Sequence, residues 1–318
     1  MIYSVRHITN FVYEPAIRES VMEVRVQPRS EFQQRCLTFS LDVNPRANIM
    51  VYRDFLGNTV HHFDIPGRYT QLKITAQALV DVSPPPPPQV SDVAGWEDLD
   101  ARVAESDYWE MLLPSRFVRS TELLQQLASE LHLERRGNPL EVLLALNQSL
   151  YETFDYVPNS TQVDSPIDDA LRTRQGVCQD LSHIMIALVR PLRIPCRYVS
   201  GYLFHETGQD RSPEGATHAW LEAFLPGPGW VAFDPTNNLM GNERHVRVAI
   251  GRDYADVPPT RGVYKGEAES ELSVTVVVSP AEAPLPEEMP PATVVRSRPL
   301  AVPGTFQYEQ QQQQQQQQ

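Results

Sequence analysis

The chain has 318 residues, and its 40 acidic and 27 basic side chains give a net charge of −13. This charge argues against a nucleic-acid-binding protein, because such proteins bind through basic groups that displace counterions. No apolar run is long enough to cross a membrane as a helix, and the N-terminus lacks the apolar block of a signal peptide. Three widely spaced cysteines do not form a disulfide framework. We therefore expect a soluble, cytoplasmic protein with reduced thiols.

The first 83 residues are predicted to form strands. Aromatic and β-branched residues gather in six short segments, which turn residues such as Asn44-Pro45 and Gly57-Asn58 separate. The segments are 3–13, 21–26, 36–43, 48–55, 59–65 and 71–80. Because they show no helical periodicity, the sequence predicts an N-terminal β-sandwich domain over residues 1–83, which serves either as a binding module or as a scaffold.

Five consecutive prolines, Pro84–Pro88, end this region and predict a stiff, extended connector. The segment 84–118 is expected to be a proline-rich linker followed by irregular or loosely helical chain. At the other end, residues 279–318 are rich in Pro, Glu and Ala and finish in nine glutamines. Such a tail cannot bury a core, so we expect it to be disordered.

Residues 119–278 are predicted to form an α+β core. Leucines at 123, 124, 127 and 131 repeat with helical spacing, and Asn138, Pro139 and Glu141 mark the start of a second helix. A third helix is expected from about Cys178 to Arg190. The strands expected after it are 196–204, 217–225, 230–234 and 272–278, with a mostly irregular stretch after residue 240. Helices followed by antiparallel strands favour an α+β fold over a doubly wound sheet.

Cys178 lies at the predicted start of an amphipathic helix. The unpaired N–H groups and the dipole of a helix N-terminus favour an anion, so this position favours the nucleophilic thiolate. Asp180, in the same first turn, would compete with thiolate formation. Cys196 is a better candidate for an inert core thiol, and His183 for a packing role within the helix.

His218 and Asp234 lie on two predicted strands that the loop Pro226-Gly-Pro-Gly229 joins. A loop with an odd number of residues would place both side chains on one face as diagonal neighbours, whereas an even loop would separate them. Given the first arrangement, Asp234 would orient the imidazole, and His218 would carry the proton for Cys178. Each residue alone has a plainer interpretation, as a buried thiol, a capping group or a surface group, but together the three favour catalysis.

Four sequence blocks resemble the bacterial transglutaminase-like superfamily, whose members are often described as candidate cysteine proteases. In chain order, the blocks are Gly176–His183, Ile194–Tyr202, His218–Trp220 and Gly229–Asn237. The stretch 250–264 and the β-rich residues 1–80 also look like this group. The resemblance implies a papain-like core in which Cys178 is the nucleophile, His218 the general base and acid, and Asp234 the orienting group. It further implies a thioester acyl-enzyme that water or an amine resolves.

Several residues depart from the family pattern or stay open. Cys196 stands where a small residue is common, and Ala216 stands where an acidic residue is common near the histidine. The backbone N–H of Cys178 is the first candidate for the oxyanion donor, and a side chain near Tyr156 is the second. We expect hydrolysis of amide or isopeptide bonds in a peptide or protein substrate, with true transglutaminase cross-linking as the alternative.

Two other classes of function compete with this hypothesis. A zinc site built from Cys178, Cys196, His183 and His218 would need spacings that match no compact ligand pattern, and no acidic loop has calcium-site spacing. We therefore expect no metal and no cofactor. The second alternative is a non-catalytic interaction protein on the same scaffold. Five arginines around the Cys178 helix, at 172, 174, 190, 193 and 197, fit ion pairs or solvated faces better than an acidic-substrate site.

Overall fold

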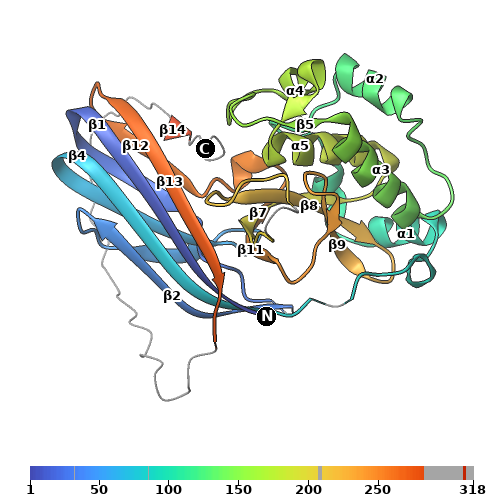
Figure 1. Ribbon diagram of the computed structural model, residues 1–318, viewed down its shortest axis with the longest axis horizontal. Coiled ribbons are helices and arrows are strands. Elements are labelled where there is room, and N and C mark those ends of the chain that lie inside the picture. Colours follow the sequence, from blue (N-terminus) through green and yellow to red (C-terminus); the bar gives the residue numbers. More distant parts are fainter. Residues whose placement is uncertain (32, 85, 207–209, 283–310, 313–318) are drawn as a thin grey trace.

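The computed structural model describes residues 1–31, 33–84, 86–206, 210–282 and 311–312. It has two parts, an antiparallel sheet built mainly from the N-terminal region and a core in which helices pack on a second sheet (Figure 1). This arrangement confirms the predicted α+β class.

The N-terminal sheet depends on two strands that are longer than the sequence predicts. β1 (Ile2–Val24) covers the segments predicted at 3–13 and 21–26, and β4 (Thr59–Val82) covers those at 59–65 and 71–80. β2 (Gln34–Asn44) and β3 (Met50–Arg53) both pair with β4. The ladder between β1 and β4 shifts register on either side of Ile17, so pairing continues through the expected turn.

Side chains on either side of these register shifts share one hydrophobic cluster, which includes Phe11, Met22, Phe63 and Leu72, whereas Val5 and Val80 at the other end of the strands pack into the cluster of the core. The predicted N-terminal β domain is therefore one hydrogen-bonded antiparallel sheet with a hydrophobic cluster of its own.

The chain returns to this sheet after the core. β12 (Thr260–Lys265) and β13 (Glu269–Pro280) both pair with β1, and the two-residue strand β14 (Gln311–Gln312) pairs with β12. The sequence assigns the strand at 272–278 to the core, whereas the structure joins it to the N-terminal sheet. Residues 283–310 and 313–318 of the predicted disordered tail lie outside the described residues.

The segment between the proline run and the core is helical and packed. It contains η1 (Val90–Asp92), α1 (Trp96–Ala104) and η2 (Tyr108–Leu112). Val93, Leu99 and Phe117 are buried in the hydrophobic cluster of the core, so this segment is part of the core packing. None of the helices in the described part of the chain is long and apolar enough to span a membrane.

The core helices begin where their capping residues predict. α2 (Glu122–Glu130) starts after Thr121, whose hydroxyl accepts the N–H of Leu124 at 3.2 Å. α3 (Pro139–Thr153) starts after Asn138, and Glu141 closes the capping box with a 3.0 Å hydrogen bond from the Asn138 N–H. α4 (Ile167–Thr173) then leads to α5 (Cys178–Val189), which is buried along its whole length.

The second sheet has the strand order β10-β9-β8-β7-β11. Its strands are β7 (Cys196–Leu203), β8 (His218–Leu225), β9 (Gly229–Asp234), β10 (Leu239–Met240) and β11 (His245–Gly251). The remaining elements are β5 (Asp155–Tyr156), β6 (Gln175–Gly176), η3 (Arg190–Leu192) and η4 (Tyr254–Asp256). The prediction of mostly irregular chain after residue 240 is wrong for β11, where apolar residues at 246, 248 and 250 alternate with other residues.

Two amide side chains of the N-terminal region satisfy the outer edge of β11. Gln34 donates to the carbonyl of Arg247 and accepts its N–H, both at 2.8 Å, and Asn58 makes the same pair of contacts with Ile250, also at 2.8 Å. Each amide thus replaces a strand neighbour, because it offers one donor and one acceptor. These contacts tie the two parts of the molecule together.

The close packing of β7 under Trp220 generates a stability prediction. A Cβ atom at Gly201 would lie 2.3 Å from the carbonyl oxygen of Val246 and 2.5 Å from the Trp220 ring. Gly201→Ala should therefore lower the free energy of unfolding by about 1–3 kcal/mol, measured by urea denaturation. Gly95→Ala is the matched control, since nothing lies within 4 Å of its Cβ position. Equal stability of the two variants would contradict the described packing.

Candidate active site

Cys178 is the first residue of α5, and the structure holds the preceding turn firmly. β5 and β6 form a parallel pair that places Tyr156 opposite Gly176, and the N–H of Val157 donates to the Gly176 carbonyl at 3.1 Å. The Cys178 side chain is almost completely buried. The nucleophile predicted from the sequence therefore lies at a helix N-terminus, as expected.

Asp180 caps this helix from inside its first turn. Its Oδ2 accepts the N–H of Val177 at 2.9 Å and the hydroxyl of Thr161 at 2.6 Å. Burial of the carboxyl group raises the pKa of Asp180 from 3.8 to about 6, although both hydrogen bonds oppose this shift. Near neutral pH the group is therefore a buried carboxylate that uses its charge to fix the helix start.

His218 begins β8 and Asp234 ends β9, and the register of this hairpin brings them together. Leu225 pairs with Gly229, so the connecting loop has three residues, which is the odd alternative. Continuing the register places Asp234 opposite Trp220 and diagonal to His218, on the same face of the sheet. The Nε2 atom of His218 lies 2.8 Å from Oδ2 of Asp234.

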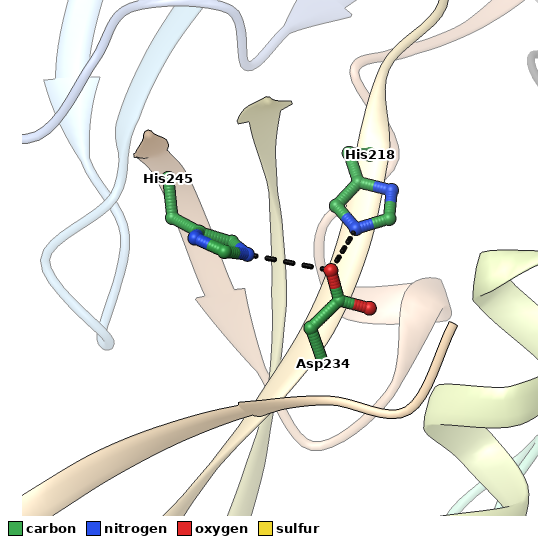
Figure 2. A group of neighbouring side chains, drawn as sticks. All are labelled: His218, Asp234 and His245. Atoms are coloured by element: carbon green, nitrogen blue, oxygen red, sulfur yellow. Dashed lines mark hydrogen bonds and ion pairs between the residues drawn. The ribbon is translucent and has the colours of Figure 1, made fainter. Parts of the chain in front are cut away.

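The Asp234 carboxylate is fully buried and accepts five hydrogen bonds. Its Oδ1 accepts the N–H groups of Thr236 at 3.0 Å and Asn237 at 3.3 Å. Its Oδ2 accepts from Asn237 Nδ2 at 2.8 Å, His218 Nε2 at 2.8 Å and His245 Nε2 at 3.3 Å, the last two drawn in Figure 2. Burial alone would raise the pKa of Asp234, but the two imidazoles hold it well below its ordinary value.

Burial also acts on His218, where it would lower the pKa. The charge and the hydrogen bond of Asp234 outweigh burial and, with a smaller contribution from the Cys178 thiol, raise the pKa of His218 to about 10. Nε2 is bound to Asp234, so the buried Nδ1 is the ring nitrogen left for the Cys178 thiol, whose hydrogen bond also raises the pKa of His218. The arrangement therefore places a protonated imidazole beside the Cys178 sulfur.

His245 is a neighbour of the carboxylate that the sequence reasoning missed. It is the first residue of β11, and its Nε2 atom points at the same Asp234 oxygen from the side opposite His218 (Figure 2). The alternating pattern of residues 245–250 was the signal for this strand. A strand predicted from this pattern would have placed a third polar side chain, that of His245, on the sheet that carries His218.

His183 and Cys196 occupy buried packing positions in the core, as the sequence predicts. His183 stacks on Phe117, with ring centroids 5.3 Å apart, and its Nε2 accepts the N–H of Tyr254 at 3.2 Å. Burial lowers the pKa of His183 to about 4 and raises that of Cys196 to about 12. Both groups are thus neutral near physiological pH, as expected for packing residues.

The zinc alternative is not supported by the positions of its four residues. Within the described ranges, one set of three potential metal ligands has its ligand atoms within 4.8 Å of one another, namely His218, Asp234 and His245. This set contains neither Cys196 nor His183. In this set the Nε2 atoms of both imidazoles already bind the carboxylate oxygen. The geometry therefore fits a hydrogen-bonded acid–base group.

The arginines around α5 are engaged within the protein. Four of them contact carboxylates, in the pairs Arg172–Asp169, Arg174–Glu130, Arg193–Asp100 and Arg197–Glu222. The fifth, Arg190, donates to three backbone carbonyls, those of Leu113, Cys196 and Arg252. The prediction that these residues form ion pairs is confirmed for the first four.

A cavity of about 560 Å³ is lined by residues of the second sheet and of the proline connector. Trp220, Trp230, Pro86 and His245 are among its lining residues, whereas Cys178, His218 and Asp234 are not. Of the side chains that donate to the Asp234 carboxylate, that of His245 lines the cavity.

Two family models match the chain. Residues 3–81 match the bacterial transglutaminase-like N-terminal region, and residues 125–235 match the transglutaminase-like superfamily. An uncharacterised protein of Mycobacterium tuberculosis is 35% identical over 294 residues, which cover 88% of this chain and 93% of that protein. A protein-glutamine gamma-glutamyltransferase of Pseudomonas aeruginosa is 31% identical over 156 residues, covering 44% of this chain and 23% of that protein.

One solved structure covers nearly the whole chain. It is described as a candidate cysteine protease from Cytophaga hutchinsonii and has a TM-score of 0.69 at 25% identity. The match covers 89% of this chain and 92% of that one, so both parts of the fold described above occur together there.

The raised pKa of Asp180 predicts a pH-dependent stability. The folded protein holds this proton up to about pH 6, whereas the unfolded chain loses it near 3.8. The wild type should therefore lose about 3 kcal/mol of unfolding free energy relative to Asp180→Asn as the pH rises from 3.5 to 7. Urea denaturation across this range measures the difference. The exposed residue Asp98 gives the control: Asp98→Asn should track the wild type, and parallel curves for Asp180→Asn would refute the assignment.

Proposed function

Because this chain belongs to the bacterial transglutaminase-like proteins, we propose that it is a cysteine-dependent acyl-transfer enzyme that acts on amide or isopeptide bonds. The observation that carries the proposal is the placement of the Cys178 thiol at a helix N-terminus beside an imidazole whose other nitrogen binds a buried carboxylate. This is the arrangement that nucleophilic cysteine chemistry requires.

In the first step, His218 holds the thiol proton at Nδ1 and the Cys178 thiolate attacks the carbonyl carbon. The tetrahedral intermediate collapses as its C–N bond breaks, and the imidazolium donates its proton to the leaving amine. The product is a thioester on Cys178 and a neutral His218. Asp234 keeps Nε2 protonated throughout, so Nδ1 is the nitrogen that exchanges the proton.

In the second step, His218 removes a proton from the acceptor, which attacks the thioester and releases the thiol. We favour water as the acceptor, because it is always present and no lysine-recognition feature stands out in the sequence. The similarity to a candidate cysteine protease supports this choice. The partial match to a protein-glutamine gamma-glutamyltransferase supports the alternative, in which a primary amine is the acceptor.

The developing oxyanion needs donors near Cys178. The backbone N–H of Cys178 is the first, and we propose the hydroxyl of Tyr156 as the second. β5 places Tyr156 beside the turn that precedes the nucleophile. Burial, followed by the negative charges of Cys178, Asp180 and Asp234, raises the pKa of Tyr156 far above its usual range, so the hydroxyl remains a donor.

The direct test uses iodoacetamide at neutral pH, with the modified residue identified by mass spectrometry. Cys178 should react fastest, because a helix N-terminus and the neighbouring His218 favour its thiolate, whereas burial raises the pKa of Cys36 to about 11 and that of Cys196 to about 12. In Cys178→Ala the fast labelling should disappear. Equal labelling of the variant and the wild type would count against Cys178 as the nucleophile and in favour of a non-catalytic interaction protein.

The acceptor is identified with a glutamine peptide, a labelled amine and the same Cys178→Ala control. Ammonia release should exceed amine incorporation, and a peptide adduct should accumulate on Cys178. Incorporation exceeding hydrolysis would reverse the preference for water and establish amine transfer.

Loss of the proposed second oxyanion donor gives a further prediction. Tyr156→Phe should lower kcat by about 10²-fold with little change in KM, because the hydroxyl would act only on the transition state. Tyr151→Phe is a matched control on α3, where the side chain packs against Arg211. An unchanged kcat in Tyr156→Phe would remove this residue from the mechanism.

A further inference from the structure

One carboxylate oxygen at the site binds two imidazoles. Oδ2 of Asp234 lies 2.8 Å from Nε2 of His218 and 3.3 Å from Nε2 of His245, and all three side chains are buried (Figure 2). The proton transfers proposed above use only His218. A second buried histidine on the same oxygen needs an explanation of its own, because burial of an imidazole is costly unless its nitrogens are satisfied.

The surroundings of His245 determine which of its nitrogens carries a proton. Asn242 offers Nδ1 both its backbone N–H, at 3.3 Å, and its side-chain Oδ1, at 3.0 Å. Nδ1 can therefore be satisfied in the neutral ring and in the charged ring. The carboxylate can only accept, so Nε2 of His245 must donate to it. Burial lowers the pKa of His245, which favours the neutral ring.

A neutral donor on Oδ2 competes with His218 for the same negative charge. Without it, the carboxylate would hold the His218 imidazolium more tightly. An acid that is held too tightly donates poorly to a leaving group, because proton transfer is most efficient when the pKa values are matched. His245 also fixes the carboxylate from the side that faces away from His218.

We propose that His245 is a positioning residue that orients Asp234 and takes up part of its charge, so that His218 releases its proton during the reaction. This role rests on the proposed acyl-transfer function. It acts through Asp234, and His245 itself has no contact with the thiol among the described interactions of the site.

The proposal concerns the protonation of His218, so every neighbouring charged or titratable group counts. Those that act on His218 or its partner are Cys178 of α5, Asp234 of β9, His245 of β11, His205 after β7 and Tyr156 of β5. Arg244 acts on His245 from the adjacent position, and Glu222 and Arg247 pair with each other at 3.2 Å beside the cavity. The His245 substitution changes one of these groups and leaves the others in place.

The test compares His245→Leu, which has no donor, with His245→Gln, whose amide can donate to Asp234. His245 borders the cavity, which leaves space for the new side chains. In a Cys178→Ala background, NMR of the His218 ring measures its titration and the low-field proton between Nε2 and Asp234. With His245→Leu the titration should move about one pH unit higher and the proton further downfield. His245→Gln should stay close to the parent.

With Cys178 restored, His245→Leu should lower kcat about tenfold and leave KM unchanged. It should also move the upper limb of the pH profile of kcat to higher pH. His245→Gln should recover most of the lost kcat. A general packing defect would lower activity in both variants without moving the limb. The role of His245 is overturned if the His218 titration in His245→Leu is unshifted or lower. If the leucine variant does not fold, the same measurement is made in His245→Phe. Absence of Cys178-dependent turnover in the wild type would instead contradict the proposed function, which the NMR titration does not require.

Discussion

The site is organised around the cost of burying the Asp234 carboxylate. An isolated carboxylate without solvent is strongly unfavourable, so its oxygens need donors from the protein. Five donors converge on it from the start of β8, the turn after β9 and the start of β11. The same requirement fixes the relative positions of these three segments. A change in the fold that moved any one of them would leave a buried charge partly unpaired.

The helix that carries Cys178 meets this group from another direction, and its first turn is fixed in a similar way. Asp180 is also buried, and it accepts from the backbone ahead of the helix and from Thr161. Two buried carboxylates therefore determine where the thiol and the imidazole lie. Each is stabilised by hydrogen bonds, and each imposes an orientation on the residue that is proposed to react.

The sequence predicts those parts of the fold that depend on local signals. The capping box of Asn138 and Glu141 locates α3, and the short loop after Leu225 makes the β8–β9 hairpin recognisable. Whether His218 and Asp234 share a face depends on one residue of loop length, which the sequence left open. The continuity of β1 and the return of β13 to it depend on pairing between distant segments, for which a single sequence holds no local signal. His245 was missed for a related reason, because its contact with Asp234 exists only once β11 pairs with β7.

The contacts of Gln34 and Asn58 with β11 bear on how this protein could be divided. A strand at the margin of a sheet offers free backbone groups to any other chain, and proteins usually cover such margins. Here the cover comes from residues that precede the proline connector, while the covered strand follows the proposed nucleophile by more than sixty positions. Separating the chain at Pro84–Pro88 would therefore expose the edge strand β11 of the core, whose backbone groups would be free to pair with another chain. The N-terminal region thus covers the outer edge of the second sheet as well as packing against the core.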